Sequence, residues 1–161
     1  METSLTSLKD RKAWFETNLT RLIVEGAPGV PNVNFVCPCC AYPTLNERAA
    51  WEICPLCSWE DDGQDDPEAD EIWGGPNHEY SLTAARINFE RYRVMYAPEN
   101  DPRIGGADRR SATRIKQSIV ASFEAMRLPN ANTKRLWREV SKGFGALDRE
   151  LNRRIGFRRL L

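Results

Sequence analysis

Two stretches decide the fold of this chain, Cys37-Pro38-Cys39-Cys40 and Cys54-Pro55-Leu56-Cys57. Each places two cysteines three positions apart with a proline second, and proline presets the backbone angle of a tight turn. The first and last thiol of each turn can therefore converge on one point. Two such turns supply four thiolates, the complete tetrahedral ligand set of a structural zinc site. The sequence predicts one zinc ion bound by Cys37, Cys40, Cys54 and Cys57.

The other features of the cysteine cluster support metal over disulfides. The chain has five cysteines, an odd number, all between positions 37 and 57, and nothing resembles a secretory signal. Cys39 is interpreted as an inert small side chain, with a redox-sensitive thiol or an alternate metal ligand as the other hypotheses. A four-thiolate shell leaves no open position for water, so we interpret the zinc as structural and the protein as not an enzyme. Trp51 and Trp59 flank the second pair and are expected to shield the thiolates.

Length and composition are those of a globular protein with one core. The chain has 161 residues, of which 41% are hydrophobic and 29% charged, an ordinary globular usage. No run approaches the roughly 18 apolar residues that a membrane span needs. We expect a cytoplasmic protein that does not enter the membrane.

Hydrophobic periodicity predicts four amphipathic helices. They are expected at residues 8–25, from 82 to near Pro98, at 112–126 and at 136–151. Ser81 is predicted to cap the second helix. The apolar stripe of the fourth helix continues through Gly143 and Gly145, where the helix either runs on with a kink or breaks into two.

A short hairpin and an acidic loop are predicted between the helices. Residues 33–36 read as a strand, with 51–53 as its partner. Residues 60–75 are rich in Asp, Gly, Gln and Pro, which favours an exposed acidic loop. The expected fold is α+β and mostly helical, with a small zinc-ribbon-like hairpin packed against amphipathic helices.

Three regions are expected to share one core: an N-terminal helix and turn (1–34), a zinc-binding region with the following helix (35–97) and a basic helical C-terminal region (98–161). Charge is divided unequally among them. Residues 41–102 carry 14 acidic and 4 basic residues, and residues 103–161 carry 5 acidic and 15 basic residues. These blocks of −10 and +10 are expected to contact each other or partners of opposite charge.

The region around the cysteines resembles the cysteine-rich CPCC proteins of bacteria, named for the tetrad at positions 37–40. The resemblance covers about residues 35–92 and includes Glu52-Ile53-Cys54-Pro55-Leu56-Cys57, Trp59-Glu60-Asp61-Asp62-Gly63, Gly75-Pro76-Asn77, Ser81-Leu82 and Ala85-Arg86. It implies zinc binding but no assigned activity. Its Glu-Asp-Asp and Gly-Pro-Asn motifs are either structural caps or a binding surface. This sequence departs from the family in having Ala41 where glycine is usual and Ser58 where an aromatic is common.

The leading functional prediction is a non-catalytic, zinc-stabilised module that binds another protein, such as a bacterial immunity protein that neutralises a toxin. Small charge-polarised bacterial proteins with a family core often have this role, which is an association rather than a physical argument. The acidic block would steer a basic partner toward the protein. The candidate partner-binding residues are Trp59, Glu60, Asp61, Asp62 and Trp73. The competing interpretation is a solvated acidic loop beside core tryptophans.

The alternative prediction is a nucleic-acid-binding or regulatory protein that uses the basic C-terminal helices. Its candidate residues recur at three- and four-residue spacing and could follow a phosphate backbone. They are Arg135, Arg138, Lys142, Arg149 and Arg153. The same pattern is also the ordinary solvated face of an amphipathic helix.

Overall fold

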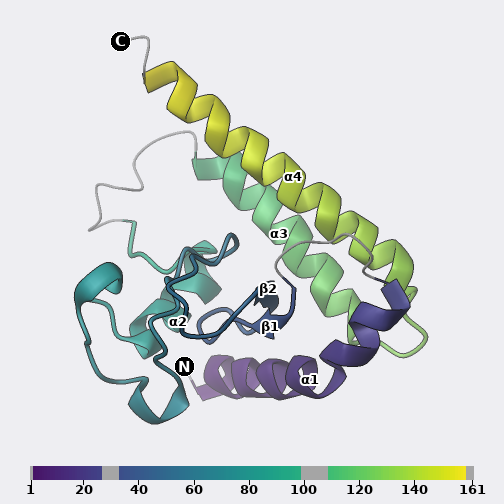
Figure 1. The fold of residues 1–161 in the computed structure, drawn as a ribbon, viewed down its shortest axis with the longest axis horizontal. Coiled ribbons are helices and arrows are strands. Elements are labelled where there is room, and N and C mark those ends of the chain that lie inside the picture. The colour runs from purple at the N-terminus through teal and green to yellow at the C-terminus, as the bar shows by residue number, and fades with distance from the viewer. Residues whose placement is uncertain (1, 27–32, 99–108, 159–161) are drawn as a thin grey trace.

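The computed structural model describes residues 2–26, 33–98 and 109–158, and their side chains except at 2–6, 109 and 153–158. In these ranges the chain is mostly helical with one short antiparallel hairpin, which confirms the predicted α+β fold class (Figure 1). The elements in chain order are α1 (Glu2–Gly26), β1 (Phe35–Val36), β2 (Pro43–Leu45), two 3-10 helices (Asp66–Glu68 and Gly75–Asn77), α2 (Leu82–Tyr92), α3 (Arg109–Met126) and α4 (Thr133–Arg158). None of the described helices has the length and apolar character needed to cross a membrane.

Helices α3 and α4 lie side by side and make the most extensive contact between elements, while α1 packs against α4, β1 and α2 (Figure 1). Helix α4 runs on without a break through Gly143 and Gly145. A Cβ atom added at Gly143 would lie 2.5 Å from Ile119 Cγ1, so the glycine is what allows α3 to approach this closely. Helix α4 is also joined to α1, because Trp137 Nε1 donates to the carbonyl of Leu22 at 2.9 Å.

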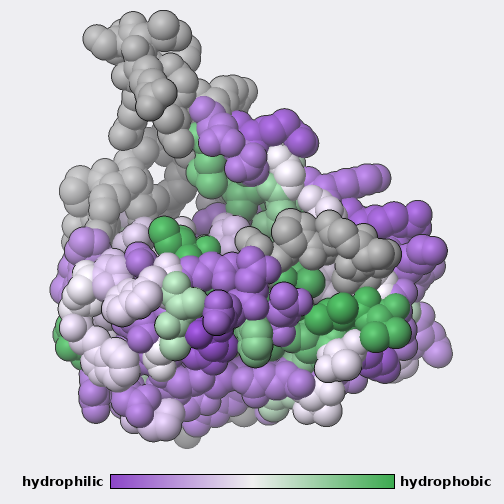
Figure 2. Space-filling view, in the orientation of Figure 1, coloured by the Kyte–Doolittle hydropathy of each residue, from purple (hydrophilic) through white to green (hydrophobic). Residues whose placement is uncertain are grey.

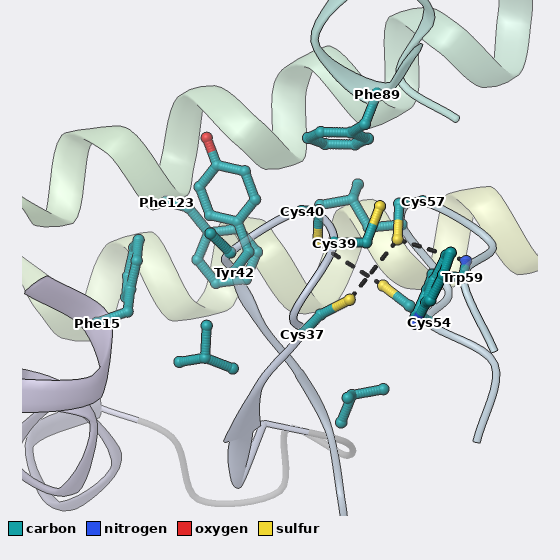
Figure 3. Packing of buried hydrophobic residues seen from close by; sticks show 14 of the residues in the cluster. Phe15, Cys37, Cys39, Cys40, Tyr42, Cys54, Cys57, Trp59, Phe89 and Phe123 are labelled. Atoms are coloured by element: carbon teal, nitrogen blue, oxygen red, sulfur yellow. Dashed lines mark hydrogen bonds between the residues drawn. The ribbon is translucent and has the colours of Figure 1, made fainter. Parts of the chain in front are cut away.

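One hydrophobic core joins the helices to the cysteine-rich region. Its centre is Phe123 of α3, whose ring stacks on Tyr42 at 5.1 Å between centroids. Edge-on contacts at 5.8 and 5.9 Å join the same ring to Phe15 of α1 and Trp137 of α4. The N-terminal helix, the cysteine-rich region and the C-terminal helices therefore bury the same set of aromatic rings (Figure 3).

The hairpin partner predicted from the sequence is wrong. Strand β1 pairs with β2, with Phe35 opposite Leu45, rather than with residues 51–53. Ile53 forms an isolated bridge with Glu60 instead. The physical reason is Ala41, whose left-handed φ of 59° reverses the chain directly after the first cysteine pair and returns it along β1.

The segment at residues 60–75, here called the acidic segment, is only in part the exposed loop that its composition predicted, because its first half is partly buried and its second half is largely exposed. Asp61 and Gln64 are 0% and 1% exposed. Lys12 of α1 donates to Asp65 Oδ1 at 2.6 Å and to Asp66 Oδ2 at 2.8 Å. The prediction failed because these carboxylates pair with a base more than fifty positions away, which composition cannot reveal.

The carboxylates of the acidic segment pair with bases outside the C-terminal helices. In the described residues, the acidic segment forms ion pairs with Lys12, Arg48 and Arg86, and none of its ion pairs reaches α3 or α4. The described ion pairs of α3 and α4 are local, as in the pair of Arg135 with Glu139. Figure 2 shows a largely hydrophilic face with separate hydrophobic areas, one of them at the end of α1, where Val24 is 81% exposed.

Candidate metal centre

The two cysteine turns, at residues 37–41 and 54–58, have the same backbone structure. In each turn the amide of the fifth residue donates to the carbonyl of the first at 2.9 Å. The amide of the first cysteine donates to the carbonyl of the sixth residue, at 2.9 Å in the first turn and 2.8 Å in the second. The fifth residues, Ala41 and Ser58, both have left-handed φ values, of 59° and 70°. The turns therefore present their thiols in equivalent ways.

The four sulfur atoms predicted from the sequence point toward a common centre (Figure 3). All four lie within 4.8 Å of one another, with Cys37 Sγ 3.7 Å from Cys57 Sγ and Cys40 Sγ 3.8 Å from Cys54 Sγ. A tetrahedral site with metal–sulfur bonds of about 2.3 Å has edges of about 3.8 Å. A disulfide would need about 2.05 Å. The cluster thus has the geometry of a site for one metal ion.

Burial disfavours the charged form of every thiol in this cluster. It raises the pKa of Cys37, Cys40 and Cys57 well above the ordinary thiol value, with hydrogen bonds among the thiols as the next contribution. Burial acts in the same direction on Cys54, but hydrogen bonds from the other three thiols and from Thr44 outweigh it and lower that pKa. Without a cation the cluster keeps most of its protons. A bound metal is what makes four buried thiolates compatible with folding.

A hydroxyl and an amide outside the cysteines lie within hydrogen-bond distance of the sulfur atoms. Thr44 of β2 is fully buried, and its Oγ1 lies 3.0 Å from Cys54 Sγ. The amide of Trp59 donates to Cys57 Sγ at 3.5 Å. Donors of this kind orient metal ligands and favour the thiolate form.

Two buried arginines, here called the arginine clamp, hold the first cysteine turn. Arg11 of α1 donates to the carbonyl of Cys40 at 3.0 Å and pairs with Glu90 at 2.6 Å. Arg86 of α2 donates to the carbonyl of Pro38 at 2.9 Å and pairs with an aspartate of the acidic segment at 2.6 Å. Their side chains are only 6% and 5% exposed. The clamp positions the first cysteine pair from two different helices.

The Glu-Asp-Asp and Gly-Pro-Asn motifs bind each other. Asn77 donates to the carbonyl of Glu60 at 2.8 Å and to Asp62 Oδ2 at 3.2 Å, and it accepts from the Glu60 amide at 3.1 Å. Asp61 accepts from Arg48 at 2.8 Å. Of the two alternatives left open by the sequence, these contacts favour structural caps.

The structure separates the predicted partner-binding residues. Trp59 and Asp61 are both 0% exposed, so neither side chain reaches the surface where a partner would bind. Glu60 and Asp62 are half-buried. Asn77 bonds to the backbone of Glu60 and to the carboxylate of Asp62. Trp73 remains available at 47% exposure.

The prediction that two tryptophans shield the thiolates fits one of them and not the other. Trp59 is buried in the core, as its proposed shielding of the thiolates requires. Trp51 is 58% exposed and does not cover the cluster in that way. Cys39 is fully buried and does not belong to the group of four converging sulfurs.

The candidate nucleic-acid residues lie on α4. Arg135, Arg138, Lys142 and Arg149 are exposed, and Arg135 pairs with Glu139 on the same helix. The side chain of Arg153 lies outside the described residues.

Sequence reasoning did not single out the residues that support the cluster. Arg86 belongs to a quoted family motif, which is a signal that could have found it. Arg11 and Thr44 carried no such signal, because an amphipathic helix and a short strand contain such residues for many reasons.

Two equivalent cysteine turns and a buried four-sulfur cluster, packed against helices in one core, define a protein with a single candidate metal centre in its described residues. The family model described as Cysteine-rich CPCC matches residues 35–110, which confirms the resemblance and extends it beyond residue 92. The match includes both cysteine turns, the acidic segment and α2, whereas α1 and α4 lie outside it. No curated protein and no solved structure gave a significant match to the chain.

Proposed function

We propose that this protein is a non-catalytic module in which one zinc ion fixes a surface that binds another protein. The observation that carries the proposal is the exposure of large apolar side chains on the segments that the metal centre and its supporting motifs hold in place. Soluble proteins seldom expose such side chains in groups without a binding role.

Zinc is the proposed metal because four cysteine thiolates in a tetrahedral arrangement are its typical structural ligands. Bound by Cys37, Cys40, Cys54 and Cys57, it would connect the two cysteine turns. All four positions of the metal would be taken by sulfur, so the role of zinc is to stabilise the fold and not to activate water.

The proposed binding surface, here called the aromatic surface, consists of Trp51, Ile53, Ile72 and Trp73. These side chains are 58%, 60%, 63% and 47% exposed. Trp51 and Ile53 form one pair, and Ile72 and Trp73 form the other. Glu60 connects the two: Ile53 forms a bridge with Glu60, and Glu60 is bonded to Asn77, which follows shortly after Trp73.

The chemistry of this surface suits a basic partner. Asp70 and Glu71 directly precede Ile72 and are exposed. Aromatic anchors supply affinity in protein interfaces, and surrounding charges steer the encounter and select the partner. A toxin neutralised by direct binding is the class of partner that we propose to test first.

The test is a pull-down with zinc-loaded protein, comparing the wild type with the double variant Ile72→Ser/Trp73→Ser. Loss of two interface anchors should weaken binding by at least about tenfold. Leu128→Ser is the matched control, because Leu128 is 64% exposed but lies beyond α3. Equal binding by the double variant would contradict the aromatic surface.

The nucleic-acid alternative is tested on the same preparations with labelled duplex and single strands. Binding through Arg138, Lys142 and Arg149 would fall by roughly tenfold or more between 50 and 200 mM salt. Tight, sequence-selective binding of this kind, with no protein partner, would replace the proposed function.

A further inference from the structure

Lys116 of α3 is buried in an unusual position. The residue is 9% exposed, and its Nζ donates to the carbonyl of Arg93 at 3.1 Å. Arg93 ends α2 in a left-handed conformation, with a φ of 59°. An ammonium has three donors, so a single neutral carbonyl does not balance its charge.

Other buried cations of the described chain have carboxylate partners. Arg11 pairs with Glu90, and Lys12 and Arg86 pair with Asp66, all at 2.6–2.8 Å. For Lys116 the described residues offer no ion pair with a carboxylate. A buried charge without an opposite charge is strongly unfavourable, so its compensation must come from another group.

The groups whose electrostatic interaction favours the charged form of Lys116 are cysteines of the metal centre. Burial lowers the pKa of Lys116, while electrostatic interaction with Cys57, Cys54 and Cys40 opposes that effect. The backbone shows the same proximity, since the Met95 amide donates to the Cys57 carbonyl at 2.8 Å. The segment at residues 93–95 is thus bonded to Lys116 on α3 and to the second cysteine turn.

The charges of the two groups are complementary. Four thiolates around a divalent ion leave a net charge of about −2 on a buried centre. Such a centre is costly without a nearby cation. Arg11 also interacts electrostatically with one thiol, that of Cys40, but its charge is already paired with Glu90. Lys116 interacts with Cys57, Cys54 and Cys40 and has no carboxylate partner in the described residues.

We propose that Lys116 is the charge partner of the loaded metal centre, a positioning residue on α3 that favours the thiolate form and so holds zinc against competition from protons. This inference rests on the proposed zinc site. It assigns an effect on the metal centre to a residue of α3 that lies beyond the family match.

The experiment compares Lys116→Gln, Lys116→Met and Lys116→Arg, purified with excess zinc, which stabilises the folded state by mass action. Glutamine can still donate to the Arg93 carbonyl but carries no charge, whereas arginine retains the charge. Lys134→Met is the control for removing an exposed lysine. The readout is the pH at which half of the zinc is released to a colorimetric chelator, together with thermal unfolding.

The glutamine and methionine variants should release zinc at a pH higher by about half a unit or more, because a lost neighbouring cation favours protonation of the thiolates. The arginine variant and the Lys134 control should match the wild type. Zinc-loaded Lys116→Gln that releases metal at the wild-type pH would overturn the inference while leaving the zinc site intact. Wild-type protein that binds no zinc would overturn the proposed function itself.

A measurement on wild-type protein can overturn the inference even if both neutral variants fail to fold. In the zinc-loaded protein, the proton and nitrogen NMR signals of the Lys116 side chain should be those of an ammonium at neutral pH. A neutral amine at that pH would contradict the role of Lys116 as a charge partner.

Discussion

The two cysteine turns share one backbone structure but lie in different surroundings. The first is enclosed: Cys39 and Ala41 are fully buried, and the arginine clamp holds its carbonyls. The second is more open, with Trp51 and Ile53 exposed immediately before it and Ser58 half-buried. The same local geometry is therefore maintained by core packing in one turn, and the other turn is expected to depend more on the metal.

Loss of a metal ligand should have the largest effect on both turns. Serine in place of Cys37, Cys40, Cys54 or Cys57 should abolish stoichiometric zinc binding and lower the free energy of unfolding by at least about 3 kcal/mol, because metal binding and folding are coupled. Cys39→Ser should keep one zinc per chain. Metal analysis and denaturant unfolding measure both effects. Zinc loss in Cys39→Ser alone would show that the ligand set is wrong.

Breaking the arginine clamp should affect the first turn selectively. Arg11→Met removes the donor to Cys40 and leaves Glu90 with only its longer ion pair to Arg93, at 3.4 Å, which should cost about 2–4 kcal/mol. Arg21→Met is the control, because Arg21 forms an exposed pair with Glu25 on the same helix. Denaturant unfolding of zinc-loaded protein gives the free energies. Equal stability of the two variants would show that core packing holds the first turn without the clamp.

Removal of zinc from the wild type should separate the two turns directly. The amides of residues 54–58 should exchange with solvent at least about tenfold faster after chelation, a difference of about 1.4 kcal/mol in local opening. The amides of residues 37–41 should change less, because the clamp and the core remain. Hydrogen exchange with mass spectrometry can compare the two peptides. An equal change in both would mean that the metal supports the turns alike.

Glycine at the left-handed positions should give the smallest effect and a difference between the turns. Ser58→Gly relieves an unfavourable φ at a half-buried site and should stabilise the protein by about 0.5–1 kcal/mol. Ala41→Gly relieves the same strain but removes a fully buried methyl group worth about 0.8 kcal/mol, so it should be nearly neutral. Thermal unfolding of zinc-loaded protein measures both. Equal gains would indicate that the environments of the two turns differ less than their burial suggests.

Local signals made much of this protein predictable from its sequence. The cysteine spacing identified the four converging sulfurs, and Ser81 does cap α2 by accepting from the Ala84 amide at 3.1 Å. These features depend on a few neighbouring residues each. Their physical causes are therefore visible in short stretches of sequence.

The errors came from long-range contacts and from a hidden turn signal. At Ala41 the chain adopts a conformation that usually selects glycine, so the reversal that pairs β1 with β2 was not apparent. The acidic segment looked solvated because its partner Lys12 lies on a distant helix. Lys116 is one of many bases in the C-terminal region, and nothing in its local sequence distinguishes a buried ammonium from an exposed one.

The ring stack between Tyr42 and Phe123 has a consequence for how the chain can be divided. The family match ends at residue 110, yet Phe123 and Glu124 of α3 lie beyond it, and the Tyr42 hydroxyl donates to Glu124 at 2.7 Å. A fragment cut at the boundaries of the match would expose the inner face of its own cysteine-rich region. The region that the family model recognises is thus smaller than the unit that can fold, and a working fragment must include α3.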